Sequence, residues 1–274
     1  MKKIVICLKD HHLSQTSGIL LGEGIAKHSG YQVDIKHISK VYPRIEKADC
    51  FVLWGMSNTA IIDYQTKKQL PTLIMEHGYL GNRDTWVSLG YNGLNGQANF
   101  YNGSITDPTR FNKHFKLRDW NNSGDYVLVA GQLPFDMAIV PYNIDKWYNE
   151  IIEELNDKHI PVVFRQHPKI EKPWFNSKLH YMEDPNIRVE ESLRNASACV
   201  TFSSNSGVLS FLNGVPTISY DNRSMVYNYT KHDLNDLSYK PDRSKWAAQI
   251  AYTQWLPEEL ESGEAWKHIK KGLD

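Results

Sequence analysis

Hydrophobic and polar positions in the first part of the chain follow two periods, one typical of strands and one typical of helices. Four short segments are apolar throughout or alternate apolar with polar, and each predicts a β-strand: residues 2–9, 31–38, 48–55 and 72–76. Residues 14–30 have apolar side chains at helical spacing and end on Gly30, which predicts a helix. A second helix is predicted from a cap at Ser57 to about Gln69. This alternation predicts a parallel, doubly wound sheet.

Residues 77–124 interrupt the alternation. They are rich in glycine and asparagine, carry turn signals and show no sustained period. Segments of this length inside a compact protein are usually functional or connect domains. Their dense aromatic residues argue against disorder.

The alternation resumes after this segment and predicts a second α/β unit. Its predicted strands are residues 125–131, 161–168, 187–189, 198–202 and 216–220. Its predicted helices are residues 145–158, 191–196 and 206–213. The tail predicts two more helices, 244–255 and 257–271. We therefore expect an α/β fold with an N-terminal domain over 1–120, a second domain over 121–243, and C-terminal helices over 244–274 that return to brace the first domain.

Composition limits the possible partners. The 274 residues include 31 Lys and Arg against 31 Asp and Glu, so no overall charge attracts nucleic acid or a membrane surface. The three cysteines, Cys7, Cys50 and Cys199, lie inside apolar runs, which indicates buried thiols in a reducing compartment. The N-terminus lacks the apolar core of a signal peptide, and no run approaches the roughly 18 apolar residues of a membrane span. These features predict a cytoplasmic protein.

Candidate chemistry follows from the fold, because open parallel sheets bind ligands beyond the carboxyl ends of their strands. The strand at 72–76 ends in Glu76, followed by His77 and a turn glycine. A carboxylate in such a place can act as a general base if burial tunes it. The alternative is an acid that caps a turn or pairs with Arg83. The sequence alone does not choose between them.

A second strand ends in Arg165-Gln166-His167-Pro168-Lys169. Arginine and lysine suit phosphate recognition, and a histidine can donate to a phosphate oxygen. Pro168 restrains the backbone of the preceding histidine. A solvated charge cluster is the commoner outcome for an isolated basic triplet.

A third strand ends in Ser203-Ser204-Asn205-Ser206-Gly207, directly before a predicted helix. The first N–H groups of a helix and its dipole form an anion site, and Gly207 would let the backbone approach a ligand. A plain helix cap is the alternative, because serine and asparagine are common capping residues. Three hydroxyls within four positions are more than one cap needs, which favours phosphate binding.

Other familiar sites are absent from the sequence. There is no Walker A or G-x-G-x-x-G pattern, and no pair of spaced cysteines or histidines indicates zinc. The adjacent His11 and His12 do not have the spacing of a metal site, so we interpret them as part of a polar loop.

The motifs "EHG", "RQHP" and "SSNS" together resemble those of two-domain GT-B glycosyltransferases, the group that includes bacterial sialyltransferases and the Kdo transferases of capsule synthesis. The resemblance implies two Rossmann-like domains that face each other across a cleft, and a nucleotide-sugar donor with no metal or other cofactor. It implies Glu76 as the base on the acceptor hydroxyl and His167 as acid or phosphate donor. His77 occupies a position where the family has Asp, so the base is either Glu76 or His77.

The same resemblance implies the donor contacts. Phosphate would be held by Arg165, His167, Lys169, Ser203, Ser204, Asn205, Ser206 and Gly207. Gln132 and Asp136, which follow the strand at 125–131, and Asp221 and Arg223, which follow the strand at 216–220, are candidate contacts to the sugar or nucleoside. For Asp136 a simple turn role after Pro134 is equally consistent.

A narrower resemblance spans residues 76–266 and points to small phage-encoded proteins of glycosyltransferase type. It implies hydroxymethylated pyrimidines in DNA as the acceptor, with surface polysaccharide as the alternative and a non-catalytic nucleotide-sugar or DNA-binding module as a third possibility. Residues 110–120 interleave basic and aromatic side chains, as a DNA-tracking stripe would, although a solvated linker is the simpler reading. The candidate acceptor residues are Arg83, Arg110, Lys113, Lys116 and Arg118.

Overall fold

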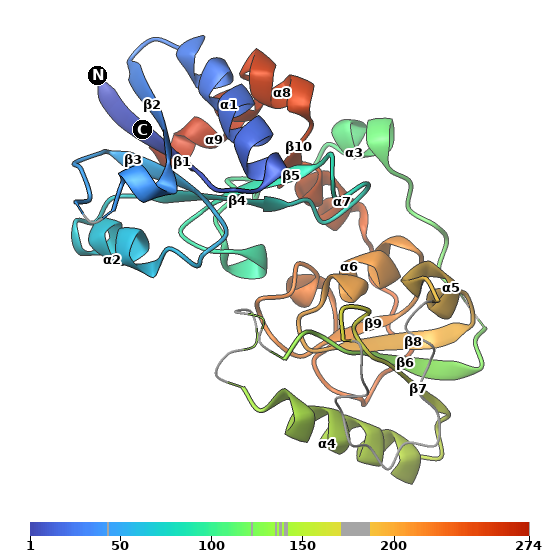
Figure 1. The fold of residues 1–274 in the computed structure, drawn as a ribbon. Coiled ribbons are helices and arrows are strands. Elements are labelled where there is room, and N and C mark those ends of the chain that lie inside the picture. Colours follow the sequence, from blue (N-terminus) through green and yellow to red (C-terminus); the bar gives the residue numbers. More distant parts are fainter. Residues whose placement is uncertain are drawn as a thin grey trace. The chain divides into compact units, whose positions relative to one another are not determined.

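The computed structural model describes residues 1–42, 44–121, 123–134, 136, 139, 142–170 and 187–273. The chain divides into two compact units (Figure 1). Unit 1 comprises Met1–Phe115 and Ala247–Asp274, and unit 2 comprises Lys116–Trp246. The cleft expected between the two domains stays a prediction.

Unit 1 is built on a six-stranded sheet in the order β10-β5-β4-β3-β1-β2. Its strands are β1 (Lys2–Leu8), β2 (Tyr31–His37), β3 (Cys50–Trp54), β4 (Thr72–His77), β5 (Val87–Tyr91) and β10 (Gln254–Trp255). Its helices are α1 (His12–Ala26), η1 (Ile38–Lys40), α2 (Thr59–Lys67), η2 (Asn95–Gln97), α3 (Thr109–His114), α8 (Pro257–Ser262), α9 (Glu264–Ile269) and η4 (Lys270–Gly272). The first four strands are parallel, as the alternation of elements predicts.

The outer part of this sheet differs from the expectation. β5 lies antiparallel to β4, and β10 lies antiparallel to β5, so the sheet is mixed. β5 was not predicted, although Val87, Leu89 and Tyr91 alternate with Ser88 and Gly90, because the strand lies inside the segment rich in glycine and asparagine. β10 was predicted as the end of a helix, although α7 (Ser244–Ile250) stops earlier. Gly263, with a φ of 83°, separates α8 from α9 where one helix was predicted.

Two apolar layers enclose the sheet of unit 1. Helices α1, α8 and α9 cover one face, where Leu21, Leu260 and Trp266 join the strand residues Ile4 and Ile6 in one buried cluster (Figure 1). The other face packs on α2 and on the loop before β3, which contributes Val41 and Ala48 to a separate buried cluster. The inner parallel strands β1, β3 and β4 are therefore largely apolar on both faces, as a doubly wound sheet requires, whereas the outer strand β2 carries Asp34 and Lys36.

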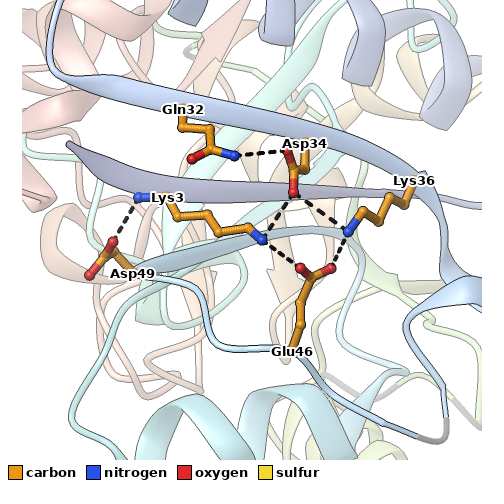
Figure 2. A network of polar contacts seen from close by, with 6 residues as sticks. All are labelled: Lys3, Gln32, Asp34, Lys36, Glu46 and Asp49. Carbon is orange, nitrogen blue, oxygen red and sulfur yellow. Dashed lines mark hydrogen bonds and ion pairs between the residues drawn. The ribbon is translucent and has the colours of Figure 1, made fainter.

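A network of charges covers part of the second face (Figure 2). Lys3 Nζ lies 3.0 Å from Asp34 Oδ2 and 2.6 Å from Glu46 Oε2, and Lys36 Nζ contacts the same two carboxylates at 3.5 and 2.5 Å. Asp49 accepts a hydrogen bond of 2.7 Å from the Lys3 backbone N–H. These contacts fasten the loop before β3 to the strands β1 and β2.

Unit 2 contains a four-stranded parallel sheet in the order β7-β6-β8-β9. Its strands are β6 (Tyr126–Ala130), β7 (Val162–Arg165), β8 (Ala196–Thr201) and β9 (Thr217–Ser219). Its helices are α4 (Ile144–Asp157), α5 (Val189–Arg194), α6 (Asn205–Leu212), η3 (Tyr227–Tyr229) and α7, which ends in unit 1. The strand predicted at 187–189 is wrong, because Val189 already begins α5. Helix α4 packs on one face, and α5 and α6 pack on the other.

Candidate active site

The strand ends of unit 2 lie at one edge of its sheet. Ala130, near the centre, pairs with Arg165 of β7 on one side and with Thr201 of β8 on the other, and Thr201 pairs with Ser219 of β9. The segments that follow these four residues therefore leave the sheet in one row. The strand order changes direction between β6 and β8, and α/β sheets bind ligands at such a point.

A buried amide bridges that point. Gln132, directly after β6, accepts a 2.8 Å hydrogen bond from Ser203 N, and its Nε2 donates to Ser203 Oγ at 3.2 Å. The Gln132 backbone N–H donates to the hydroxyl of Tyr148 at 2.7 Å. Gln132 and Ser203 are only 5% and 6% exposed. Gln132 thus fixes the serine turn, and its predicted contact with a donor stays a prediction.

The serine turn caps helix α6, which begins at Asn205, one residue before the predicted start. Ser204 is the N-cap: its Oγ accepts a 3.2 Å hydrogen bond from Ser206 N and lies 3.2 Å from Ser206 Oγ. The Ser204 N–H donates to Thr201 Oγ1 at 3.0 Å. The capping interpretation of Ser204 is therefore confirmed. Phosphate binding by Ser203, Ser204, Asn205 and Ser206 stays a prediction. The N-terminus of α6 at this turn is the kind of place where anions bind.

Gly207 has a packing role that the sequence did not indicate. A Cβ on Gly207 would lie 2.9 Å from Thr201 Cγ2 and 3.4 Å from Val226 Cγ2. The absent side chain thus permits close packing of α6 in the interior of the unit. Contact of the Gly207 backbone with a ligand stays a prediction.

The basic cluster after β7 is divided between the interior and the surface. Arg165 is 7% exposed, whereas Lys169 is exposed. His167 Nδ1 accepts a 3.2 Å hydrogen bond from Lys169 N, so the proton of the neutral ring resides on Nε2. An Nε2–H is the donor that a phosphate oxygen requires. Convergence of His167 with Ser203 and Ser204 on one anion stays a prediction.

Asp221 and Arg223, after β9, bind each other. Arg223 Nε and Nη2 donate to the two carboxylate oxygens at 2.5 and 2.9 Å, and this pairing raises the pKa of Arg223. The guanidinium lies 4.7 Å from the ring of Tyr142, which is 53% exposed, and 5.8 Å from that of Phe202. Tyr142 therefore offers an aromatic surface near the serine turn. Asp136 is exposed and accepts a turn hydrogen bond from Ile139 N.

The corresponding edge of unit 1 gathers Glu76 and His77 from β4, Trp54 from β3, and the turn after β1. Glu76 Oε1 accepts from the His77 backbone N–H at 3.0 Å and lies 4.0 Å from His77 Nε2. Lys9, after β1, donates to Ser57 Oγ at 2.7 Å. Burial lowers the pKa of Lys9, and the nearby charge of Glu76 opposes that shift. The predicted helix cap at Ser57 is wrong, because α2 is preceded by Asn58.

Sequence analysis missed two residues at this edge. His11, read as polar loop, is the N-cap of α1 and lies 5.1 Å from Trp54 and 5.8 Å from His77 between ring centroids. The strand-end rule that singled out Glu76 applies equally to His11. Gln254, fully buried in β10, accepts from Tyr79 N at 2.7 Å and Leu80 N at 2.9 Å and holds the turn after His77. The sequence carries no signal for that long-range contact.

Arg110 corrects the predicted acceptor stripe. Its side chain is 8% exposed and forms an ion pair with Glu259, which is also 8% exposed. It donates to the carbonyls of Ala251 at 2.8 Å and Gln254 at 3.0 Å, and it stacks 4.5 Å from Trp255. Arg110 therefore stabilises the interior of unit 1 and is not an acceptor contact. The remaining candidates are exposed, and they are Arg83, Lys113, Lys116 and Arg118.

The cysteines take no part in either edge. All three are free and buried, as expected, and burial raises the pKa of each thiol to about 12.

Within the part of the chain that the structure describes, no three His, Cys, Asp or Glu side chains are grouped to hold a metal ion. Over the same residues, no helix is long and apolar enough to cross a membrane.

Comparison with solved structures identifies the fold. The chain is similar to the β-Kdo 2,4-transferase of KpsC from Thermosulfurimonas dismutans, with a TM-score of 0.62, 14% identity and coverage of 98% of both chains. It is also similar to the β-Kdo 2,7-transferase of KpsC from that organism, with a TM-score of 0.53, 12% identity and coverage of 97% of this chain and 100% of the other. No protein-family model and no curated protein sequence matches. The chain has the GT-B fold that the sequence motifs imply.

Proposed function

We propose that this protein is a glycosyltransferase that moves a sugar from a nucleotide-sugar donor to a hydroxyl group. One observation carries the proposal: the serine turn, the histidine turn and the Asp221–Arg223 pair leave one edge of the unit 2 sheet from strands in register. The GT-B fold supports it as analogy, because fold alone does not establish function.

Unit 2 would bind the donor. The N-terminus of α6 directs backbone N–H groups at an anion, and the Nε2–H of His167 adds a hydrogen-bond donor. Lys169, exposed in the same turn, supplies positive charge. Tyr142 offers a surface on which a nucleobase can stack. These groups would stabilise the negative charge that develops on the leaving phosphate, without a metal ion.

Unit 1 would bind the acceptor and remove its proton. Glu76 and His77 are both at the edge, with side chains 31% and 23% exposed, so either can reach solvent. The new C–O bond forms at the anomeric carbon of the sugar. The bond from that carbon to the phosphate oxygen breaks, and its electron pair leaves with the nucleotide.

A carbohydrate is the acceptor that we favour. Two similar structures with TM-scores above 0.5 are named as Kdo transferases. The burial of Arg110 also removes one member of the basic stripe proposed to contact DNA. Hydroxymethylated DNA, as in phage enzymes of this type, is the second candidate acceptor, because Lys113, Lys116 and Arg118 are exposed.

Two measurements test this function. A thermal-shift panel of UDP, CMP, ADP and GDP should show stabilisation by at least one nucleotide, since a ligand at 100 times its Kd adds about 2.7 kcal/mol. The matching radiolabelled nucleotide sugar is then incubated with oligosaccharides and with a hydroxymethylcytosine duplex. Label in glycan supports a carbohydrate acceptor, and label only in DNA would show that the acceptor is hydroxymethylated DNA. No nucleotide shift and no transfer would refute it.

A further inference from the structure

Two histidines that the chain brings together in unit 1 have complementary hydrogen-bonding states. His11 follows β1, and His77 ends β4. Their rings meet edge to face at 5.8 Å, and both pack on Trp54 at the end of β3, at 5.1 and 5.4 Å. Three neighbouring parallel strands thus deliver one ring each to the same edge, where the strand order changes direction.

The backbone fixes which nitrogen of each neutral ring holds the proton. His77 Nδ1 lies 2.8 Å from the carbonyl oxygen of Arg83. A carbonyl only accepts, so Nδ1 carries the proton and Nε2 of His77 is a base. His11 Nδ1 accepts from Ser14 N at 3.4 Å, so its proton is on Nε2, which is a donor. One imidazole of the pair therefore accepts and the other donates.

A carboxylate and an ammonium lie beside the pair. The carboxylate of Glu76 lies 4.0 Å from His77 Nε2, so its negative charge opposes the positive charge that a proton taken from the acceptor would bring to this ring. The ammonium of Lys9, across the edge, is held by Ser57 and attracted by Glu76.

We propose that His77 and His11 together bind the acceptor, with His77 Nε2 taking the proton of the reacting hydroxyl and the His11 Nε2–H donating to a neighbouring oxygen of the same molecule. The inference rests on the proposed function and narrows it. A vicinal diol of a carbohydrate presents one O–H donor and one adjacent oxygen acceptor, which matches the pair. The proton moves from oxygen to His77 as the new C–O bond forms, and His77 later releases it to water.

The first test is independent of activity. Long-range ¹H–¹⁵N correlation spectra of the histidine-labelled protein at pH 8 distinguish the two tautomers. Single variants His11→Asn and His77→Gln assign the two rings among the 11 histidines. We expect the proton on Nδ1 of His77 and on Nε2 of His11. Either ring in the opposite tautomer would overturn the pair, whether or not the protein transfers sugar.

The second test uses the donor that stabilises the protein and a methyl hexoside as acceptor. His77→Gln should lower kcat at least 100-fold, the low end of general-base effects, with the nucleotide thermal shift unchanged. Free imidazole should restore part of the rate of His77→Ala. His11→Asn, which can still cap α1, should lower kcat/KM for the hexoside about tenfold, the effect of one lost hydrogen bond, while His12→Asn should not.

The outcomes separate the two proposals. Wild-type kinetics in His77→Gln, or equal kinetics in His11→Asn and His12→Asn, would overturn the histidine pair and leave glycosyl transfer standing. If the wild-type protein binds no nucleotide and labels no acceptor, the proposed function fails, and the proton-transfer role fails with it. In that case the NMR spectrum still shows whether the proton is on Nε2 of His11 and on Nδ1 of His77.

Discussion

Replacing Arg110 with methionine should destabilise unit 1 strongly, because it removes one member of a buried ion pair. Arg110 holds both carboxylate oxygens of Glu259, and both side chains are 8% exposed. In Arg110→Met, the Glu259 carboxylate would keep only the 2.8 Å hydrogen bond from Leu256 N. Breaking a buried pair in this way costs about 3–5 kcal/mol. Methionine retains the apolar stem, so the loss reflects the charge and hydrogen bonds.

The effect should depend on pH in a defined direction. Burial raises the pKa of Glu259, but the hydrogen bonds from Arg110 and Leu256 outweigh it, so the net shift is downward. A carboxyl with a lowered pKa stabilises the fold above its unfolded value, near 4, and this stability is lost as the pH falls through the folded value. The deficit of Arg110→Met should therefore be largest near pH 7 and shrink toward pH 4, where its unpaired Glu259 becomes protonated.

Urea unfolding followed by far-UV circular dichroism measures the deficit at pH 7 and pH 4.5. Lys113→Met is the matched control, because Lys113 is exposed on the same helix. Arg110→Met/Glu259→Gln should recover most of the loss, since glutamine can accept the Leu256 hydrogen bond without a buried charge. A deficit below about 1 kcal/mol, well under the range for a broken buried pair, or an equal one in Lys113→Met, would refute the structural role of Arg110.

Three further predictions concern other parts of the molecule. Ser204→Ala should lower the free energy of unfolding by about 1 kcal/mol through the lost cap, whereas Ser204→Asp should retain the cap and abolish nucleotide-induced thermal stabilisation; an Asp variant that still responds to nucleotide contradicts phosphate binding there. Hydrogen bonds from Lys3 lower the pKa of both Asp34 and Glu46, so urea stability should fall as the pH drops below about 4, and less so in Glu46→Gln. A pH profile unchanged by that substitution would contradict the network's contribution. Excess EDTA should leave sugar transfer unchanged, and loss of transfer that Mg²⁺ or Mn²⁺ restores would contradict a metal-independent mechanism.

The parallel part of the fold was predictable because local patterns determine it. Buried strands such as Cys50–Trp54 and helices such as α4 show up as apolar runs or helical spacing within a few residues. β5 and β10 were not predictable in this way. β10 has only two residues and is a strand only because it pairs with β5, far earlier in the chain. β5 is as long as Cys50–Trp54, but it lies in a segment rich in glycine and asparagine, where turn signals obscure a strand.

The candidate site shows the same division. The rule that ligands bind beyond parallel strands selected Glu76, His167 and Ser203 from the sequence. It could not show that Arg110 is buried against a segment almost 150 positions later. His11 also follows a parallel strand, so the same rule could have selected it, whereas the adjacent His11 and His12 lack the spacing of a metal site. A tautomer is fixed by hydrogen bonds to the backbone, which the sequence does not display.

Each edge of the molecule is fixed by one buried glutamine. Gln132 binds Ser203 across the switch point of unit 2, and Gln254 binds Tyr79 and Leu80 behind His77 in unit 1. A buried amide that lost its partners would be costly, so each turn is held in one arrangement. Sites whose first contacts are supported by such outer hydrogen bonds keep their geometry as charge develops. The two glutamines contact different elements but have the same role, since each holds the backbone of one turn in place. A hydroxyl-rich turn or an imidazole can assist a reaction only when the backbone that carries it does not move.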